Sequence, residues 1–254
     1  MKAQARMRDA SVFIIFAAVA LLLVSLAYAD PQGPTNIARG ASERAPSTAP
    51  TEVQAEAGNV TSLQIIATKI TSRWQGFYGN VTGNITLADS SSNAMYNWIE
   101  TAPRGEIYAV NDSAIPTWGD VFCFNFTNNL SAGSNVVQRF NGTHLETTLG
   151  LNPTDADGVD ETFNRTFAGS FQVAGNSIGS TSGCRTVALN VNGGYQEQSF
   201  QEVLLTDNNS IIYTAILENS QTGFQGTPTD FQMIVGEDGD TAAPTSYYFY
   251  VELT

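Results

Sequence analysis

The alternation of apolar and polar positions predicts β-strands through most of the chain. From Val60 onward, short runs of β-branched and aromatic residues are separated by clusters of Gly, Asn, Asp and Pro, which is the pattern of strands joined by turns. In the last run, Tyr247, Phe249 and Val251 would share one face of a strand. The predicted strands are residues 63–72, 84–88, 106–110, 121–126, 135–140, 167–173, 186–191, 200–205, 211–217, 231–235 and 247–253.

Two of these runs predict a hairpin over residues 202–217. The polar turn Asp207-Asn208-Asn209 separates them, and Asn and Asp tolerate the positive φ that a tight turn requires. No stretch after residue 30 combines a helical repeat with capping residues. Many short strands with turns between them predict an all-β fold, specifically an Ig-like or jelly-roll-like β-sandwich over residues 59–254.

The amino terminus, residues 1–29, has the organisation of a secretory signal peptide. Basic residues precede an apolar run over residues 12–24, and Ala27-Tyr28-Ala29 fits a signal peptidase site. Cleavage after Ala29 would release the protein. Retention of residues 12–29 would leave a short hydrophobic helix that anchors it in a membrane with its carboxyl terminus outside. A pilin-like leader is a third alternative, although residues 11–16 lack the acidic side chain that such subunits carry.

Residues 30–58 predict a flexible linker between this segment and the β-domain. They are rich in Pro, Ala, Ser, Thr and Glu and contain almost no large apolar side chain. Such a composition buries too little surface to offset the entropy lost on folding.

Composition and charge narrow the range of functions. The chain has 254 residues, a formal net charge of −13 and a pI near 4.3, which argues against nucleic acid as a partner, because phosphate binding needs Lys and Arg. One His rules out a multi-His metal site, and two Cys rule out Cys-rich zinc sites and iron–sulfur clusters. Without a sound catalytic triad or metal set, the sequence predicts a protein that is not an enzyme.

The number of cysteines and the number of glycosylation sequons both favour export. Cys123 and Cys184 are the only cysteines, and an even number in an exported chain favours one disulfide over free thiols. Closing a loop of about 60 residues would stabilise the fold by ~4 kcal/mol in the chain-entropy model. Sequons for N-glycosylation, more frequent than chance, begin at Asn59, Asn80, Asn84, Asn111, Asn125, Asn129, Asn141, Asn164 and Asn208.

An acidic turn is the candidate metal site. Carboxylate oxygens are the ligands that Ca²⁺ prefers. The spacing differs from that of an EF-hand loop, so we expect any Ca²⁺ here to be structural. The alternative is a solvated acidic turn, and no other cofactor is implied. The candidate ligands are Asp155, Asp157, Asp160 and Glu161.

A group of aromatic residues is the candidate ligand site. Trp74, Phe77 and Tyr78 lie around two glycines, and aromatic rings near Asp and Asn stack on sugars. They would make the chain a carbohydrate-binding module for envelope polysaccharide. The alternative places these rings in the core, where strand aromatics are more often found.

Three segments together resemble a known family. They are TKITSRWQGFYGNVTGNITLADSSSNAMYNW (68–98), DGVDETFN (157–164) and the tail containing FQEVLLTDNNSIIYTAILE, TDFQMIVGEDGD and YYFYVEL. The family comprises exported, N-glycosylation-prone, β-rich surface proteins of uncharacterised function from small-genome archaea. The resemblance implies a secreted or surface β-rich domain behind an amino-terminal hydrophobic segment, and it implies no catalytic residues.

Taken together, these patterns favour a non-enzymatic extracellular or cell-surface glycoprotein. Its structural or adhesive β-sandwich domain would contribute to the cell envelope, to attachment or to a surface assembly. The expected partners are a membrane if the amino-terminal segment is retained, a second copy of the chain, envelope polysaccharide or another surface protein. The alternatives are the carbohydrate-binding module and a pilin-like filament subunit, which would assemble through its amino-terminal helix or by strand exchange at an open sheet edge.

Overall fold

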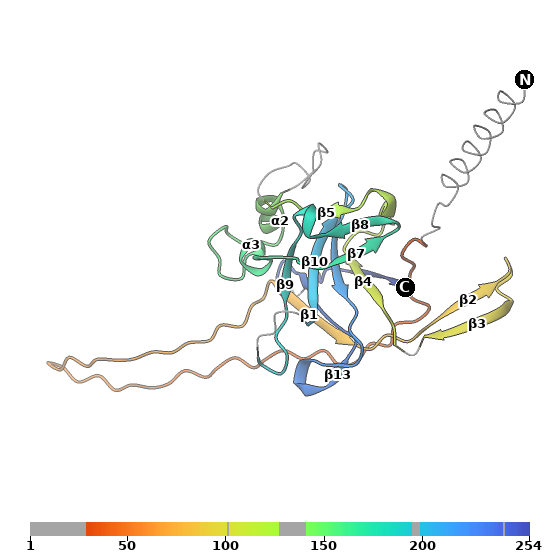
Figure 1. Ribbon diagram of the computed structural model, residues 1–254. Coiled ribbons are helices and arrows are strands. Elements are labelled where there is room, and N and C mark those ends of the chain that lie inside the picture. Colours follow the sequence, from red (N-terminus) through yellow and green to blue (C-terminus); the bar gives the residue numbers. More distant parts are fainter. Residues whose placement is uncertain (1–28, 101, 127–140, 195–198, 241) are drawn as a thin grey trace, which may run out of the picture.

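The computed structural model describes residues 29–100, 102–126, 141–194, 199–240 and 242–254 (Figure 1). The predicted hydrophobic segment, apart from Ala29, and the predicted strand 135–140 lie outside these ranges. Within them, no helix combines the length and the apolar character needed to cross a bilayer. The described chain is mostly antiparallel β-structure, which confirms the all-β prediction.

A seven-stranded antiparallel sheet forms the centre of the body. Its order is β15 (Tyr248–Leu253), β4 (Gly105–Val110), β11 (Ile211–Ile216), β10 (Gln201–Thr206), β9 (Arg185–Ala188) and β6 (Arg165–Thr166), with β5 (Phe122–Cys123) also paired to β10. β9 and β5 share one edge of β10 end to end, since Val203 lies opposite Thr186 and Leu205 lies opposite Cys123.

The predicted hairpin 202–217 is confirmed as β10 and β11. Thr206 lies opposite Ile211, and side chains of the turn satisfy its backbone. The Asp207 carboxylate accepts hydrogen bonds from the backbone N–H groups of Asn209 (2.9 Å) and Ser210 (2.7 Å), and from Thr117 in a neighbouring loop (2.9 Å). Asn208 has the positive φ of +74° that the turn residues predict.

Both faces of the central sheet are buried. On one face, Ala109, Leu204 and Tyr213 pack against a second sheet of β1 (Trp74–Gly79) and β14 (Phe231–Gly236), whose Met233 and Val235 enter the same core. On the other face, the core contains Tyr108, Val110, Val203, Leu205 and Ile212 from the sheet and Phe171, Val173 and Ile178 from the hairpin of β7 (Ser170–Val173) and β8 (Asn176–Gly179). Continuous apolar runs in β4, β10 and β11 follow from this double coverage.

Two short helices differ from the prediction of no helix. α2 (Gly142–Thr148) begins at Asn141, whose side-chain oxygen accepts a hydrogen bond from the backbone N–H of His144 (3.0 Å). α3 (Val159–Thr162) lies inside the acidic turn. Each helix is a turn or two long, too short to show a hydrophobic repeat, and Leu145, Leu149 and Val159 pack against the core. The remaining elements are η1 (Trp118–Asp120), η2 (Ser180–Ser182), η3 (Phe224–Gly226), β12 (Gln221–Thr222) and β13 (Pro228–Thr229).

The predicted strand 63–72 is wrong. Residues 59–70 are in no strand, and Ile65 and Ile66 are 79% and 89% exposed. They belong to a long excursion that leaves the body within the predicted linker and returns at β1 (Figure 1). A strand requires a partner for its backbone groups, and this segment has none in its own chain among the described residues. Gln32, inside the predicted linker, instead pairs with Val251 at the outer edge of β15, with N–O distances of 3.0 and 2.8 Å.

Candidate functional site

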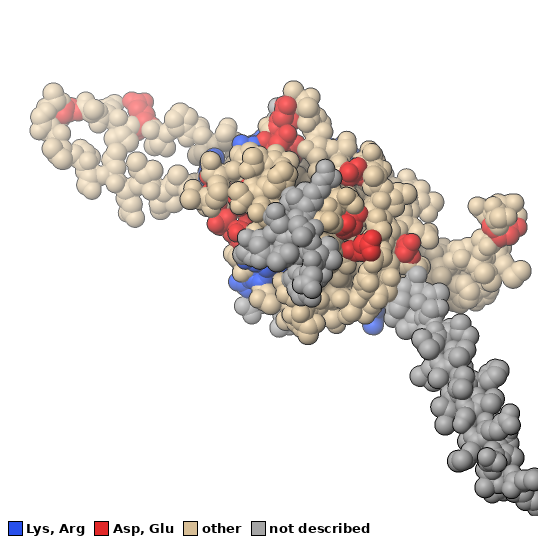
Figure 2. Space-filling view, turned by 90° about the horizontal axis from the view of Figure 1, so that it is seen from above, with Lys and Arg blue, Asp and Glu red and all other residues tan. Residues whose placement is uncertain are grey.

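An exposed hairpin projects from the body at the end of β1. It consists of β2 (Gly83–Ala88) and β3 (Ala94–Glu100), which pair with each other and with no other described strand. Figure 1 shows it in yellow, directed away from the central sheet, and Figure 2 shows from above that it stands clear of the body. Both of its strand edges therefore carry unpaired backbone N–H and C=O groups.

One face of this hairpin is apolar and uncovered. Ile85 lies opposite Trp98 and Leu87 opposite Tyr96, so these four side chains share one face, which we call the aromatic face. The rings of Tyr96 and Trp98 meet edge to face with centroids 4.9 Å apart. Tyr96 and Trp98 are nevertheless 58% and 51% exposed. Exposed contiguous apolar surface of this kind is typical of an interaction site.

The opposite face carries polar side chains together with Ile99, which is 76% exposed. Thr86 lies opposite Asn97, and the Thr86 hydroxyl donates a hydrogen bond to the Asn97 side-chain oxygen (2.8 Å). The predicted glycan acceptor Asn84 is exposed on this same face, opposite Ile99. A glycan on Asn84 would therefore leave the aromatic face accessible.

Sequence reasoning found only half of this hairpin. It predicted β2 but missed β3, where the run Ala94–Glu100 contains Asn97 and carries Met95 and Tyr96 as neighbours. The irregular register between Leu87 and Ala88 breaks the alternation that identifies a strand. The signal available was the close spacing of Tyr96 and Trp98 at every second position.

The disulfide joins the two strands that share the edge of β10. Cys123 and Cys184 are bonded, with Cα atoms 5.0 Å apart, and both are buried. Cys123 lies in β5, and Cys184 directly precedes β9. The bond therefore closes the gap between β5 and β9, which no backbone ladder spans.

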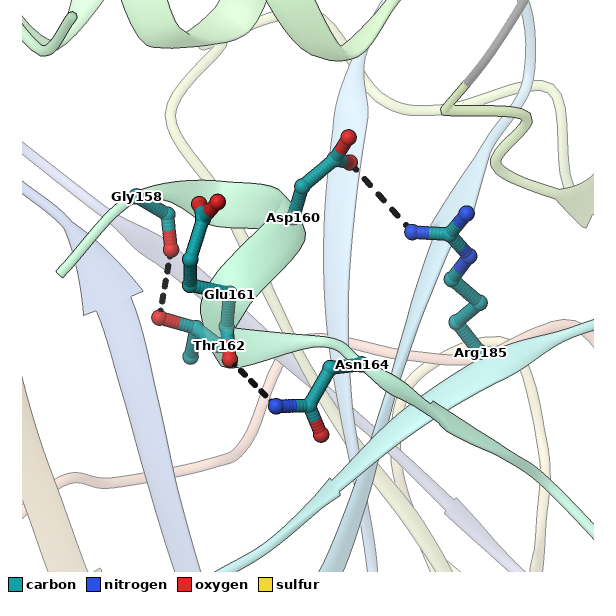
Figure 3. Close-up of polar contacts among 6 residues, drawn as sticks. All are labelled: Gly158, Asp160, Glu161, Thr162, Asn164 and Arg185. Atoms are coloured by element: carbon teal, nitrogen blue, oxygen red, sulfur yellow. Dashed lines mark hydrogen bonds and ion pairs between the residues drawn. The ribbon is translucent and has the colours of Figure 1, made fainter. Parts of the chain in front are cut away.

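Five of the nine predicted glycan acceptors are exposed in the described structure. Asn125, Asn141 and Asn208 are half-buried, and Asn129 lies outside the described residues. The amide nitrogen of Asn164 donates a hydrogen bond to the Glu161 carbonyl oxygen (2.7 Å; Figure 3). The exposed acceptors are Asn59, Asn80, Asn84, Asn111 and Asn164.

The carboxylates of the predicted calcium ligands interact with different groups of the protein. The Asp155 carboxylate accepts a hydrogen bond from the backbone N–H of Asn152 (2.8 Å), and the Asp157 carboxylate accepts one from the Thr71 hydroxyl (2.5 Å). Asp160 is turned toward Arg185, at 3.4 Å, as Figure 3 shows. Within the described part of the chain, no three His, Cys, Asp or Glu side chains are grouped so as to hold a metal ion.

Glu146 is the acidic residue that sequence reasoning missed in this region. Its buried side chain approaches α3, and its carboxylate accepts hydrogen bonds from the backbone N–H groups of Val159 and Asp160. Burial raises its pKa, and the charges of Asp160 and Glu161 raise it further against these hydrogen bonds. The Glu146 carboxylate thus accepts hydrogen bonds from backbone N–H groups that have no partner within the first turn of α3.

The three aromatics predicted to bind sugar do not share one face. Phe77 is half-buried and meets Phe249 edge to face (5.4 Å between centroids). The indole N–H of Trp74 donates to the Asp157 carbonyl oxygen (2.8 Å), and its ring lies 6.3 Å from that of Phe163. Only Tyr78 is exposed, at 47%, and its ring lies beside Phe224.

Three further glutamates, in addition to Glu146, lie inside the body. Glu106 of β4 is opposite Glu252 of β15, and the Tyr108 hydroxyl donates to Glu252 (3.0 Å). Burial, followed by the charge of Glu252, raises the pKa of Glu106 to about 8. Glu202 accepts a hydrogen bond from the backbone N–H of Ile234 (2.8 Å), and its complete burial raises its pKa well above the ordinary value.

No protein family, curated protein or solved structure that we compared matches this chain. Its function must therefore be argued from its own residues.

Proposed function

We propose that the protein is a non-enzymatic extracellular or cell-surface glycoprotein whose β-domain takes part in a surface assembly. The exposed aromatic face of the β2–β3 hairpin carries this proposal. A monomeric soluble domain rarely presents an apolar hairpin to water, because each exposed ring costs solubility and offers a site for association. The resemblance of three sequence segments to exported surface proteins of archaea agrees with this proposal.

The disulfide supports an oxidising compartment. Disulfides persist in exported proteins and are rare where cytosolic reductants keep thiols reduced. The buried Cys123–Cys184 bond links β5 and β9 and belongs to the framework of the body rather than to an exposed thiol pair. We further propose that the two sheets form a β-sandwich of the Ig-like or jelly-roll-like kind.

Polysaccharide binding is the second candidate. It rests on Tyr78 and Phe224, two exposed rings whose centroids lie 5.1 Å apart. It receives less support than a surface assembly, because Trp74 and Phe77 pack toward the core. Binding to purified envelope polysaccharide that Tyr78→Ala abolishes and Trp98→Ser leaves intact would favour this candidate.

The location is tested by labelling intact cells with a membrane-impermeant amine reagent. Lys69 is exposed and is the only lysine after Lys2, so it reports the position of the β-domain. We expect peptide mass spectrometry to find the label on Lys69 of intact cells. Labelling only after lysis would overturn the surface location. The same spectra give the amino terminus: Asp30 indicates a released protein, Met1 an anchored one and a start near Ser11 a pilin-like subunit.

The role in an assembly is tested by fractionation of cells that express variants. We expect the wild-type protein to sediment with the envelope and Trp98→Ser to be released. Ile115→Ser is the matched control, since Ile115 is a large exposed side chain in a loop outside the hairpin. Equal sedimentation of all three proteins would contradict the proposed role of the aromatic face.

A further inference from the structure

A second unpartnered apolar element lies in the same chain as the exposed hairpin. Residues 63–70, which we call the donor segment, have the sequence LQIIATKI and the composition of a strand. Residues 63–69 are exposed and Ile70 is half-buried, and no described strand pairs with them. Their apolar side chains fall on both sides of the extended chain. Strands that are apolar on both faces belong inside a sheet assembly rather than in water.

The β2–β3 hairpin lacks a third strand, and the donor segment would supply one. An isolated two-stranded hairpin is marginally stable in water, and a third strand with apolar side chains is what makes such a ribbon stable. Both edges of the β2–β3 hairpin are open to an added strand. Strand addition supplies main-chain hydrogen bonds, and alternate side chains of the added strand extend the aromatic face.

Charge favours the pairing. Lys69 is the only charged residue in residues 57–72, and Asp89 and Glu100 are the only charged residues in residues 80–100. In a chain of net charge −13, an association between two acidic surfaces would be opposed by repulsion. The donor segment is a region of positive sign, so it meets the acidic hairpin without this cost.

Position excludes the chain's own hairpin as the partner of the donor segment. The donor segment ends just before β1, and the hairpin begins just after it, so six residues of extended strand, about 20 Å, separate the two elements. β1 is held in place by its ladder with β14. Figures 1 and 2 show the excursion and the hairpin leaving opposite sides of the body in both views.

We propose that the donor segment of one copy of this chain adds as a strand to the β2–β3 hairpin of a second copy. The contact is head to tail, because the donor and the acceptor are different surfaces at opposite ends of the molecule. Repetition of a head-to-tail contact that does not close on itself produces a fibre. This inference rests on the proposed function and names the partner in the assembly as the chain itself.

Two variants, one with a disabled donor and one with a disabled acceptor, test this proposal on the full chain as cells produce it. Ile65→Asp with Ile66→Asp disables the donor and leaves the hairpin intact, whereas Trp98→Ser disables the acceptor and leaves the donor intact. All three side chains are exposed, so the variants should fold, which an unchanged unfolding midpoint checks. Val53→Asp and Ile115→Ser are the matched controls at exposed positions outside both elements.

Sedimentation velocity gives a distinctive expected result. The wild type and both controls form species that grow with concentration, and each disabled variant remains monomeric alone. An equal mixture of the two disabled variants forms dimers that grow no further, because each dimer combines the one intact donor with the one intact acceptor. A mixture that stays monomeric would overturn the proposal.

Three other results distinguish the failure of this inference from the failure of the proposed function. Assembly that Trp98→Ser abolishes and the donor variant leaves intact would overturn the donor assignment while the proposed function stands. A wild type that is monomeric at every concentration, and whose envelope sedimentation is insensitive to Trp98→Ser, would overturn both. Association insensitive to both variants would place the contact elsewhere, for example in the amino-terminal segment, and would also overturn the inference.

A cross-link identifies the contacting residues. One preparation carries Ile66→Cys, the other carries Met95→Cys in β3, and a short thiol-reactive cross-linker is added to their mixture. We expect a cross-linked dimer from this pair and at least tenfold less from Val53→Cys mixed with Met95→Cys. Equal yields from the two pairs would overturn the proposal. Peptide mapping confirms that the native Cys123–Cys184 disulfide is intact in each sample.

Discussion

Two hairpins of similar length have opposite surroundings in this protein. β10 and β11 lie at the centre of the large sheet, are buried on both faces and carry a turn whose backbone is satisfied by Asp207. Among the strands that the structure describes, β2 and β3 pair only with each other, and they expose both faces. The first hairpin is stabilised by burial within its own chain. The second hairpin has the backbone pairing of a sheet, but its apolar side chains are not buried. Such a surface is typical of a site that binds a partner.

The cost of substitutions should therefore differ sharply between the two regions. Changes in the body should alter the free energy of unfolding and leave association intact, as long as the protein folds. Changes on the aromatic face should do the reverse.

Loss of the disulfide should lower the free energy of unfolding of the body more than any other change considered. Replacing Cys123 and Cys184 together by Ser should lower the free energy of unfolding by about 2–5 kcal/mol, because the unfolded chain loses its constraint and β5 its covalent link to β9. Urea unfolding without reductant measures the effect, and wild type with reductant should resemble the variant. An unchanged midpoint in both experiments would show that the disulfide does not hold the body together.

Gly105→Ala should cost roughly 2–4 kcal/mol. Gly105 has φ +125°, and a Cβ there would collide with the backbone carbonyl oxygen of Glu252 in the neighbouring strand. Gly119→Ala is the matched control, since a Cβ on Gly119 would meet no atom within 4 Å. Thermal unfolding should separate the two variants. Equal midpoints would mean that β4 and β15 tolerate a larger separation than the structure shows.

The body should be most stable in mild acid. The pKa of Glu106 is raised to about 8 in the folded state, so the stability that its protonated form provides is complete below about 4.5 and is lost as pH rises through 8. The raised pKa values of Glu202 and Glu252 act in the same direction. Glu106→Gln should stabilise the protein at pH 8.5 relative to wild type by about 2–4 kcal/mol and leave it unchanged at pH 4.

The control for this titration is Glu43→Gln, at an exposed position of the excursion. Unfolding curves at half-unit steps between pH 4 and pH 9 should give parallel profiles for Glu43→Gln and wild type and a flatter one for Glu106→Gln. A Glu106→Gln profile parallel to wild type would contradict the assigned role of Glu106.

Trp98→Ser should have the smallest effect on the monomer. The Trp98 side chain is 51% exposed on a hairpin that stands clear of the body, so we expect a change within about 0.5 kcal/mol in the free energy of unfolding. A loss above about 2 kcal/mol would show that the hairpin is part of the folding unit, and the contrast between the two regions would fail.

The sequence predicted elements well where local pattern and tertiary burial agree. The hairpin 202–217 has two apolar runs and a turn of Asp and Asn, and the fold places it where those signals require. The strand predicted at 63–72 has the same propensity but no partner among the described residues of its chain, and propensity alone does not form a sheet. Backbone pairing is a property of two segments, so a pattern read from one segment cannot establish it.

The candidate site was less accessible to sequence reasoning. The number of cysteines predicted the disulfide, but not its position at the junction of β5 and β9. Trp74, Phe77 and Tyr78 are neighbours in sequence, yet the alternation of β1 and the contact with Asp157 separate them. The aromatic face became apparent only from register, because Ile85 and Trp98 meet across two strands.

Hydrogen exchange of the backbone amides of β3 and residues 63–70, measured as a function of protein concentration, tests the central claim most directly. Both segments should exchange rapidly in dilute monomer and gain protection together as concentration rises, with β10 and β11 protected throughout. The gain should be absent in both segments of Trp98→Ser. Rapid exchange of residues 63–70 at concentrations where β3 is protected would contradict the account.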